Sequence, residues 1–159
     1  MDSRMKKYWL VKSEPDVYPF SQLKKDGSTG WTGVRNYQAR NFMRDSMQPG
    51  DGVLFYHSSA EPKAIAGTAK VLRAGVPDPS QFDKNSEYYD AKSSRENPTW
   101  VMAEIAFERE FERPVTLEEL KKTAGLEKMM VVQRGARLSV QPVTEAEWRI
   151  VLKLGGAKA

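Results

Sequence analysis

The sequence is organised around a stretch in which a glycine-flanked tryptophan runs into a helix: Trp31-Thr32-Gly33-Val34-Arg35-Asn36-Tyr37-Gln38-Ala39-Arg40-Asn41. Gly30 precedes the indole and Gly33 follows it, which predicts a loop around Trp31. Asn36 predicts the N-cap of the helix, because its side-chain oxygen can accept a hydrogen bond from an unpaired backbone N–H of the first turn. Apolar residues then recur at helical spacing, and the Pro-Gly pair at 49–50 predicts the end of the helix.

This stretch has two interpretations. A helix start with arginines beside a tryptophan offers hydrogen-bond donors for a phosphate and a flat face for a base. Alternatively, Trp31 belongs to the core and the arginines to a solvated face, because aromatic side chains most often serve packing. The residues of this stretch alone leave both interpretations open.

Strand-like and helix-like segments are mixed along the rest of the chain. Runs rich in β-branched and aromatic residues predict strands over residues 8–13, 53–58, 63–74, 100–107, 131–135 and 137–141. Short helices are predicted at 19–24, from Asn36 to the 49–50 pair, from Thr116 to near Gly125, and from Thr144 to Gly155. Residues 77–98 have no convincing apolar period and predict a long surface excursion with one short helix near Gln81.

The order of these segments indicates the fold class. Strands and helices do not alternate regularly, as they would in a doubly wound parallel sheet. We therefore expect an α+β fold, a small mixed or antiparallel barrel with short helices around it. The 159 residues predict a single domain over 1–159, long enough to bury a core.

Composition excludes several classes of protein. The chain has no cysteine, which excludes a disulfide framework, thiolate metal sites and a cysteine nucleophile. His57 is the single histidine, which argues against zinc, so we expect no metal and no cofactor. No long apolar run is present, so neither a signal peptide nor a membrane span is expected. The net charge of +4 permits nucleic-acid binding without demanding it.

Motifs for common enzyme chemistry are missing. The sequence has neither a glycine-rich phosphate loop nor a Gly-x-Ser-x-Gly elbow. His57 could act as a base, but no nucleophile or orienting residue can be assigned to it, and a lone histidine at a strand end is more often structural. The sequence therefore gives an enzyme little support.

A set of aromatic and hydrogen-bonding side chains remains that suits a nucleotide. Bases stack on aromatic rings such as Trp31, Tyr56 and Trp100. Side chains that could hydrogen-bond a base edge are those of Lys12, Ser13, Asn36 and His57. Cations that could meet phosphates are Arg35, Arg40, Arg44 and Arg134. The combination favours nucleic-acid binding, although each residue alone also has a structural explanation.

Four blocks of the sequence, at residues 8–15, 31–41, 50–58 and 137–144, resemble the EVE domain family of the PUA-like superfamily. The resemblance covers nearly the whole chain, and the block at 31–41 is its most specific part. It implies a PUA-like mixed β pseudo-barrel flanked by short helices. It also implies a non-enzymatic module that binds DNA bearing methylated or hydroxymethylated cytosine, with the modified base flipped into a pocket.

The resemblance also implies roles for individual residues. Lys12 and Ser13 would line the base pocket, Trp31 would stack on or wall the base, and Tyr56 with His57 would lie at the end of the facing strand. Arg35 and Asn36 would anchor the helix start or the nucleic-acid backbone. Assigned by their chemistry, Trp100 joins the pocket, and Arg40, Arg44 and Arg134 join the backbone contacts.

Two other functions stay open at this point. One is an RNA-binding accessory domain that acts on modified tRNA or rRNA. The other is an enzyme or small-molecule-binding domain that uses His57 and the same pocket on a nucleotide. The expected location is the cytoplasm of a bacterial-type cell; the sequence is silent on oligomeric state.

Overall fold

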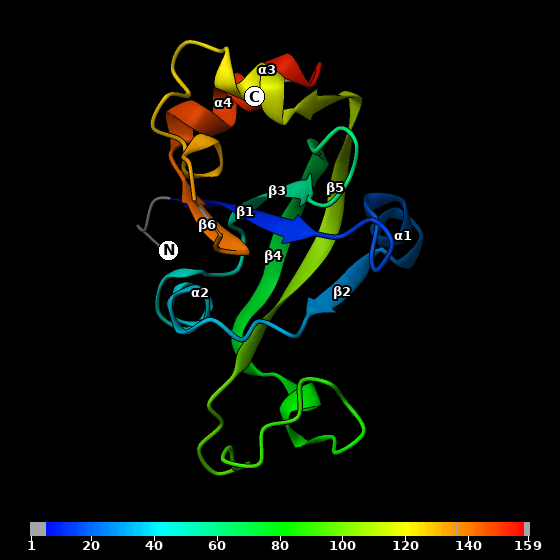
Figure 1. The fold of residues 1–159 in the computed structure, drawn as a ribbon, viewed down its shortest axis with the longest axis vertical. Coiled ribbons are helices and arrows are strands. Elements are labelled where there is room, and N and C mark those ends of the chain that lie inside the picture. Colours follow the sequence, from blue (N-terminus) through cyan, green and yellow to red (C-terminus); the bar gives the residue numbers. More distant parts are fainter. Residues whose placement is uncertain (1–5, 136, 158–159) are drawn as a thin grey trace.

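Six strands form one mixed sheet in the computed structural model, which describes residues 6–135 and 137–157 (Figure 1). The predicted domain of 1–159 also includes residues 1–5, 136, 158 and 159, which lie outside that description. The strands are β1 (Tyr8–Ser13), β2 (Ser28–Trp31), β3 (Gly52–His57), β4 (Ala64–Pro77), β5 (Val101–Thr116) and β6 (Val140–Val143). Their order in the sheet is β2-β5-β4-β3-β1-β6, and β1 pairs in parallel with β3 whereas the other neighbours are antiparallel.

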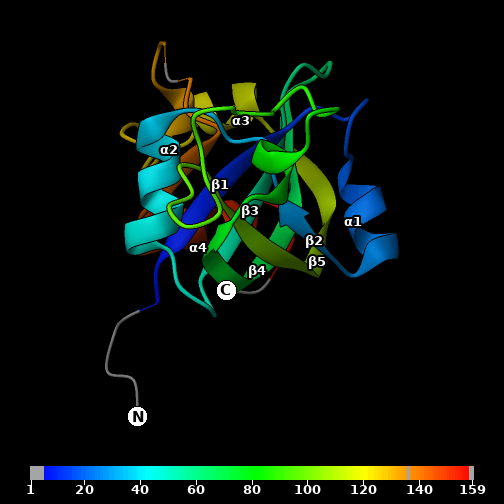
Figure 2. The ribbon, with the colours of Figure 1, turned by 90° about the horizontal axis from the view of Figure 1, so that it is seen from below.

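Short helices cover one end and two sides of the sheet. Figure 1 shows α3 and α4 together at one end of the long strands β4 and β5, and Figure 2 shows α1 and α2 on opposite sides of the strands. The α-helices are α1 (Phe20–Asp26), α2 (Tyr37–Asn41), α3 (Leu117–Lys121) and α4 (Glu145–Leu154). The other helical segments are a π-helical turn η1 (Phe42–Ser46) directly after α2, and the 3-10 helices η2 (Pro79–Phe82) and η3 (Met130–Val132).

Strand alternation divides the core into two clusters. Successive residues of a strand point to opposite faces of the sheet, so Val53 and Phe55 join one cluster whereas Leu54 and Tyr56 join the other. The first cluster also takes buried side chains from α1, α2 and η1, and the second takes them from α3 and α4. The two faces of β3 therefore pack against different helices, and neighbouring residues of this strand lie in different clusters.

The fold class predicted from the sequence is confirmed, because a mixed six-stranded sheet with short helices is an α+β fold. The predicted caps are confirmed as well. Asn36 accepts a hydrogen bond from the N–H of Ala39 at 3.0 Å. Thr144 and Glu147 form a reciprocal capping box at the start of α4. The part of the chain that the structure describes contains no helix long and apolar enough to cross a membrane.

Three local predictions are wrong. Residues 131–135 form the end of η3 and a turn instead of a strand, because Val131 is buried against the second cluster and the backbone pairs within the turn. The predicted strand at 137–141 begins only at Val140. The loop expected around Trp31 is instead the end of β2, which pairs with β5.

The β4–β5 connection, residues 78–100, is anchored by a buried glutamine. Gln81 donates to the carbonyl oxygens of Asp78 and Trp100, both at 2.7 Å, and accepts from the Ser93 hydroxyl at 2.6 Å and the Trp100 N–H at 2.9 Å. These four bonds use both donors and both acceptor positions of the amide. The predicted excursion with a short helix near Gln81 is therefore confirmed, and polar contacts rather than an apolar core hold it.

We expect Gln81→Met to lower the free energy of unfolding by about 3 kcal/mol or more, because it leaves several buried backbone groups without partners. Gln48→Met is the matched control, since Gln48 is exposed and makes no side-chain hydrogen bond with the described residues. It should change the free energy by less than about 0.5 kcal/mol. Urea unfolding of both variants measures the difference, and equal midpoints would show that the glutamine network does not anchor the connection.

Candidate functional site

A cavity of about 490 Å³ opens beside the C-terminal end of β1. Strand β2 and the loop to α2 form one wall, and the turn after β1 and the segment before β6 form others. The volume lies within the range of small-molecule and base-binding pockets, about 300–1,000 Å³. The lining residues are Lys12, Ser13, Glu14, Val17, Tyr18, Thr29, Gly30, Trp31, Thr32, Gly33, Val34, Arg35, Asn36, Tyr88, Arg137 and Ser139.

The Trp31 indole stands at the boundary between the cavity and the core. It is half-buried at the end of β2 and lines the cavity. Its ring meets Phe55 at 5.5 Å between centroids with an interplanar angle of 79°, and Tyr18 at 6.4 Å and 82°. Edge-to-face contacts of this kind hold an aromatic ring in place. The indole is thus fixed by the core while part of it remains open to the cavity.

The end of β1 supplies Lys12 and Ser13. The Lys12 N–H donates to the Ser139 carbonyl oxygen at 2.9 Å, which keeps the segment before β6 against the cavity. The buried Ser13 hydroxyl donates to the Tyr18 carbonyl oxygen and fixes the turn after β1. Burial, followed by the nearby charge of Lys63, lowers the pKa of Lys12. A hydrogen-bond acceptor on a ligand would oppose this effect, because it stabilises the charged form of the amine.

Arg35 lines the cavity, but all of its donors are engaged within the chain. Its guanidinium donates to the carbonyl oxygens of Val34 and Tyr88, to the Ser80 hydroxyl and to the Asp78 carboxylate. These contacts use all five N–H groups of the side chain. Arg35 therefore positions the cavity wall, and it has no donor left for a phosphate in this arrangement.

Asp78 ties the loop after β2 to the β4–β5 connection. Its fully buried carboxylate accepts from the Gly33 N–H at 2.8 Å, from Arg35 at 3.1 Å, and from the N–H and hydroxyl of Ser80 at 2.8 and 2.6 Å. Burial opposes ionisation, but the hydrogen bonds outweigh it and hold the pKa of Asp78 below its usual value. The carboxylate is thus charged in the folded chain and sets the geometry of this wall.

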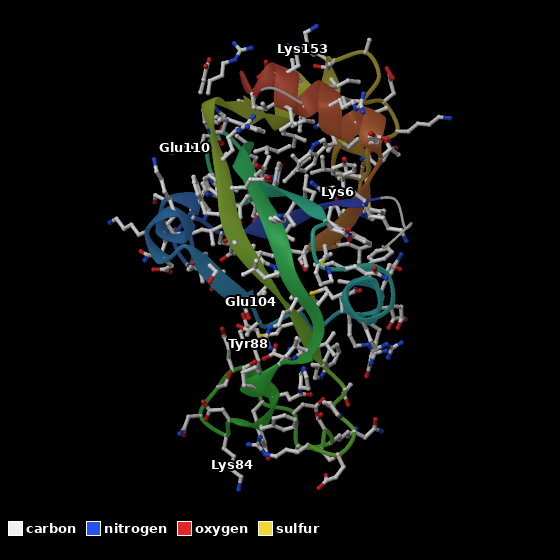
Figure 3. The ribbon with its side chains drawn as sticks, turned by 180° about the vertical axis from the view of Figure 1, so that it is seen from behind. Lys6, Lys84, Tyr88, Glu104, Glu110 and Lys153 are labelled. Atoms are coloured by element: carbon white, nitrogen blue, oxygen red, sulfur yellow. The ribbon has the colours of Figure 1, made fainter. Side chains whose placement is uncertain are left out.

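Gly33 is required by this geometry for two reasons. Its φ of +84° lies in the left-handed region that side chains disfavour, and a Cβ there would come within 2.8 Å of the Tyr88 ring. Figure 3 shows Tyr88 on the side of the connection nearest the sheet, whereas Lys84 lies at its far end. The glycine therefore allows the tyrosine to close over the loop and line the cavity.

Five of the predicted site residues line this cavity: Lys12, Ser13, Trp31, Arg35 and Asn36. Tyr56 and His57 do not. Tyr56 lies in the second core cluster, on the opposite face of β3 from Phe55, which backs the indole. His57 faces the Phe55 side, and its Nε2 accepts a hydrogen bond from the Phe20 N–H at 3.0 Å. The lone pair of His57 thus holds the first turn of α1.

Trp100 and the remaining arginines lie outside the cavity. The buried Trp100 indole N–H donates to Asp90 at 2.8 Å, and its ring stacks against Tyr37 at 4.9 Å. Arg40 donates to Asn41 and to the Thr99 carbonyl oxygen. Arg44 pairs with Asp45 on the exposed surface of η1, and Arg134 lies on an exposed turn after η3. The three arginines therefore do not converge on one place.

Sequence reasoning missed part of the lining. Arg137 and Ser139 belong to the block at 137–144, which carried a family signal that could have placed them beside β1. Glu14 directly follows Lys12 and Ser13, two residues predicted to line the pocket, so its position in the chain could have indicated that it lines the pocket as well. Tyr88 had none, because contacts distant in sequence, those of Asp78 and Arg35 among them, bring the connection to the cavity.

The cavity joins the block at 31–41 to the end of β1 on a mixed sheet, and residues 7–154 match the EVE domain family. The chain belongs to that family. It is 40% identical to thymocyte nuclear protein 1 of Homo sapiens over 165 residues, which cover 92% of this chain and 73% of the human protein. It is 42% identical to thymocyte nuclear protein 1 of Danio rerio, over 92% of this chain and 71% of that protein.

Solved structures agree with this membership. The human protein in complex with DNA containing 5-methylcytosine superposes with a TM-score of 0.87 and 38% identity, over 97% of this chain and 100% of that one. A protein from Pseudomonas putida superposes with a TM-score of 0.89 and 45% identity, over 93% and 99% of the two chains. An ASCH protein from Zymomonas mobilis shares only the fold, with 11% identity and a TM-score of 0.54.

We expect Arg35→Met to lower the free energy of unfolding by about 3 kcal/mol, because it leaves the Asp78 carboxylate buried without its ion partner. Arg44→Met is the matched control, since it breaks an arginine–aspartate pair that is exposed on both sides. The control should unfold at the same denaturant concentration as the parent chain. A similar midpoint for both variants would mean that Arg35 is not needed to hold the wall.

His57 predicts a pH dependence of stability. Burial lowers the pKa of His57 in the fold from its ordinary 6.5. As the pH falls below about 6.5, the unfolded chain therefore takes up a proton that the folded chain resists, and the free energy of unfolding decreases. His57→Gln keeps an acceptor for Phe20 without titrating. Urea unfolding between pH 7.5 and 5 should show a smaller decrease for this variant, and parallel curves would contradict the prediction.

Proposed function

We propose that this chain is a non-enzymatic nucleic-acid-binding module that recognises methylated or hydroxymethylated cytosine in DNA. The modified base is flipped out of the duplex into the cavity beside β1. There it meets the Trp31 indole, with Lys12 and Ser13 at the base edge. Arg35 and Asn36 shape the adjoining wall and the start of α2, and Arg137, the other arginine of the cavity lining, meets a phosphate.

The observation that carries this proposal is the position of Trp31. An indole that only filled the core would be sealed, whereas this one lines a cavity of about 490 Å³. Stacking on an aromatic ring stabilises a base by about 1–3 kcal/mol. Extruding a base costs a few kcal/mol, so stacking and hydrogen bonds at the base edge together can offset that cost.

Two further observations support the proposal. The human relative has been solved bound to DNA containing 5-methylcytosine, and its structure covers 97% of this chain. His57, the residue on which an enzyme function would depend, uses its Nε2 lone pair to accept from the Phe20 N–H and lies outside the cavity lining. A base catalyst needs that lone pair, so the arrangement favours a reader over an enzyme.

A methyl or hydroxymethyl group adds only a small contact, so discrimination should be moderate. In titrations of a duplex with one central modified cytosine, we expect affinity about fivefold to a hundredfold higher than for the unmodified duplex, corresponding to roughly 1–3 kcal/mol. Trp31→Ala should lower affinity for the modified duplex by about fivefold to a hundredfold through loss of stacking. Fluorescence anisotropy at one fixed salt concentration measures both effects, because salt changes phosphate contacts.

Two variants control this experiment. Trp31→Phe keeps an aromatic face and should retain most of the affinity. Tyr89→Ala removes an exposed ring outside the cavity lining and should have no effect. Equal affinity for modified and unmodified duplexes, together with no effect of Trp31→Ala, would sink the proposal. Tighter binding to RNA of the same sequence would favour an accessory RNA-binding domain instead.

A further inference from the structure

The cavity carries one negative charge among several positive ones. Its cationic lining residues are Lys12, Arg35 and Arg137. Among the described lining residues, Glu14 is the single carboxylate. A carboxylate in a site for polyanionic DNA repels the phosphates, so it does not promote phosphate binding. A contact with the base is the interaction in which its negative charge would be useful.

The Glu14 backbone is fixed by hydrogen bonds, whereas its side-chain carboxylate is exposed. Its carbonyl oxygen accepts from the N–H groups of Val17 and Tyr18, both at 2.9 Å, so the turn after β1 fixes where the residue begins. The side chain is exposed and makes no hydrogen bond or ion pair with the described residues. Arg35, the charged neighbour across the lining, has all five donors engaged elsewhere. The carboxylate therefore keeps its acceptor capacity for a ligand.

The chemistry of the proposed ligand requires such an acceptor. 5-Methylcytosine and thymine both carry a methyl group at C5, and they differ at position 4, where cytosine has an amino donor and thymine has a keto acceptor. Stacking on Trp31 and an apolar contact with the methyl group would accept either base. A reader of modified cytosine that lacked an acceptor at position 4 would therefore be occupied by thymine, an ordinary base of DNA.

We infer that Glu14 is the residue that selects cytosine over thymine, by accepting a hydrogen bond from the exocyclic amino group of the flipped base. This inference rests on the proposed function and assigns the base specificity of that site. Glutamate and aspartate are the side chains that accept from this amino group in protein–DNA complexes. The same carboxylate repels the O4 atom of thymine, because two acceptors then face each other without a proton between them.

The experiment uses duplexes that differ in one base. The central position carries 5-methylcytosine, cytosine or thymine opposite an abasic site, so none of the three bases has a pairing partner to lose. The full chain should bind 5-methylcytosine at least about tenfold more tightly than thymine, as expected for one hydrogen bond to a charged acceptor. Glu14→Gln should reduce this ratio to within about threefold of unity, because an amide can rotate to donate to O4.

Asp16→Asn is the matched control. It removes the same charge two residues away on the same turn, at a position outside the cavity lining. It should raise affinity for all three duplexes alike, through reduced phosphate repulsion, and leave the ratio of methylcytosine to thymine unchanged. If Glu14→Gln also raises all affinities equally, Glu14 contributes only charge and the inference fails.

The two proposals fail in different ways. A chain that prefers 5-methylcytosine to cytosine and loses affinity on Trp31→Ala, yet keeps its methylcytosine-to-thymine ratio in Glu14→Gln, retains the proposed function and overturns the role of Glu14. A chain that binds all three duplexes equally and ignores Trp31→Ala overturns both. Restoration of the ratio in Glu14→Asp, at reduced affinity, would support the carboxylate as the selecting group.

Discussion

A buried carboxylate holds together two of the segments that line the cavity: the loop after β2 and the β4–β5 connection. Asp78 stands 45 residues after Gly33, and its oxygens accept from the Gly33 N–H, from Arg35 and from Ser80. Burying a charge without partners is costly, so each of these donors is needed once the carboxylate is inside. The loop that follows Trp31 and the connection that carries Tyr88 therefore share one arrangement. That ionic junction sets the position of Gly33, Arg35 and Tyr88 in the cavity wall.

The second constraint is strand alternation. β3 delivers Phe55 to the face that supports Trp31 and Tyr56 to the opposite face, so Tyr56 does not reach the cavity beside that indole. His57 returns to the Phe55 face, but the start of α1 lies there and takes its lone pair. The cavity instead collects its side chains from strand ends and loops, where alternation no longer fixes direction.

Much of the fold could be predicted from the sequence because its signals are local. The apolar runs of β1 and β3, the Asn36 cap and the capping box at Thr144 depend on neighbours within a few residues. The prediction failed where tertiary contacts override such patterns. Val131 is β-branched, as strand residues often are, but the second cluster buries it in a 3-10 turn. β2 is short and rich in small residues, and its pairing with β5 alone makes it a strand.

Some features of the candidate site could likewise be predicted from the sequence, and others could not. The sequence by itself determined the fold class, the family resemblance with its assignment of Lys12 and Ser13 to the pocket, and the position of Trp31 beside a helix start. Only the tertiary structure decided that Arg35 is engaged by Asp78 and Tyr88, and that Glu14 and Tyr88 line the cavity. The physical reason is that a side chain is available to a ligand only when the folded chain leaves its donors or acceptors unused. That outcome depends on partners tens of residues away, which no local pattern records.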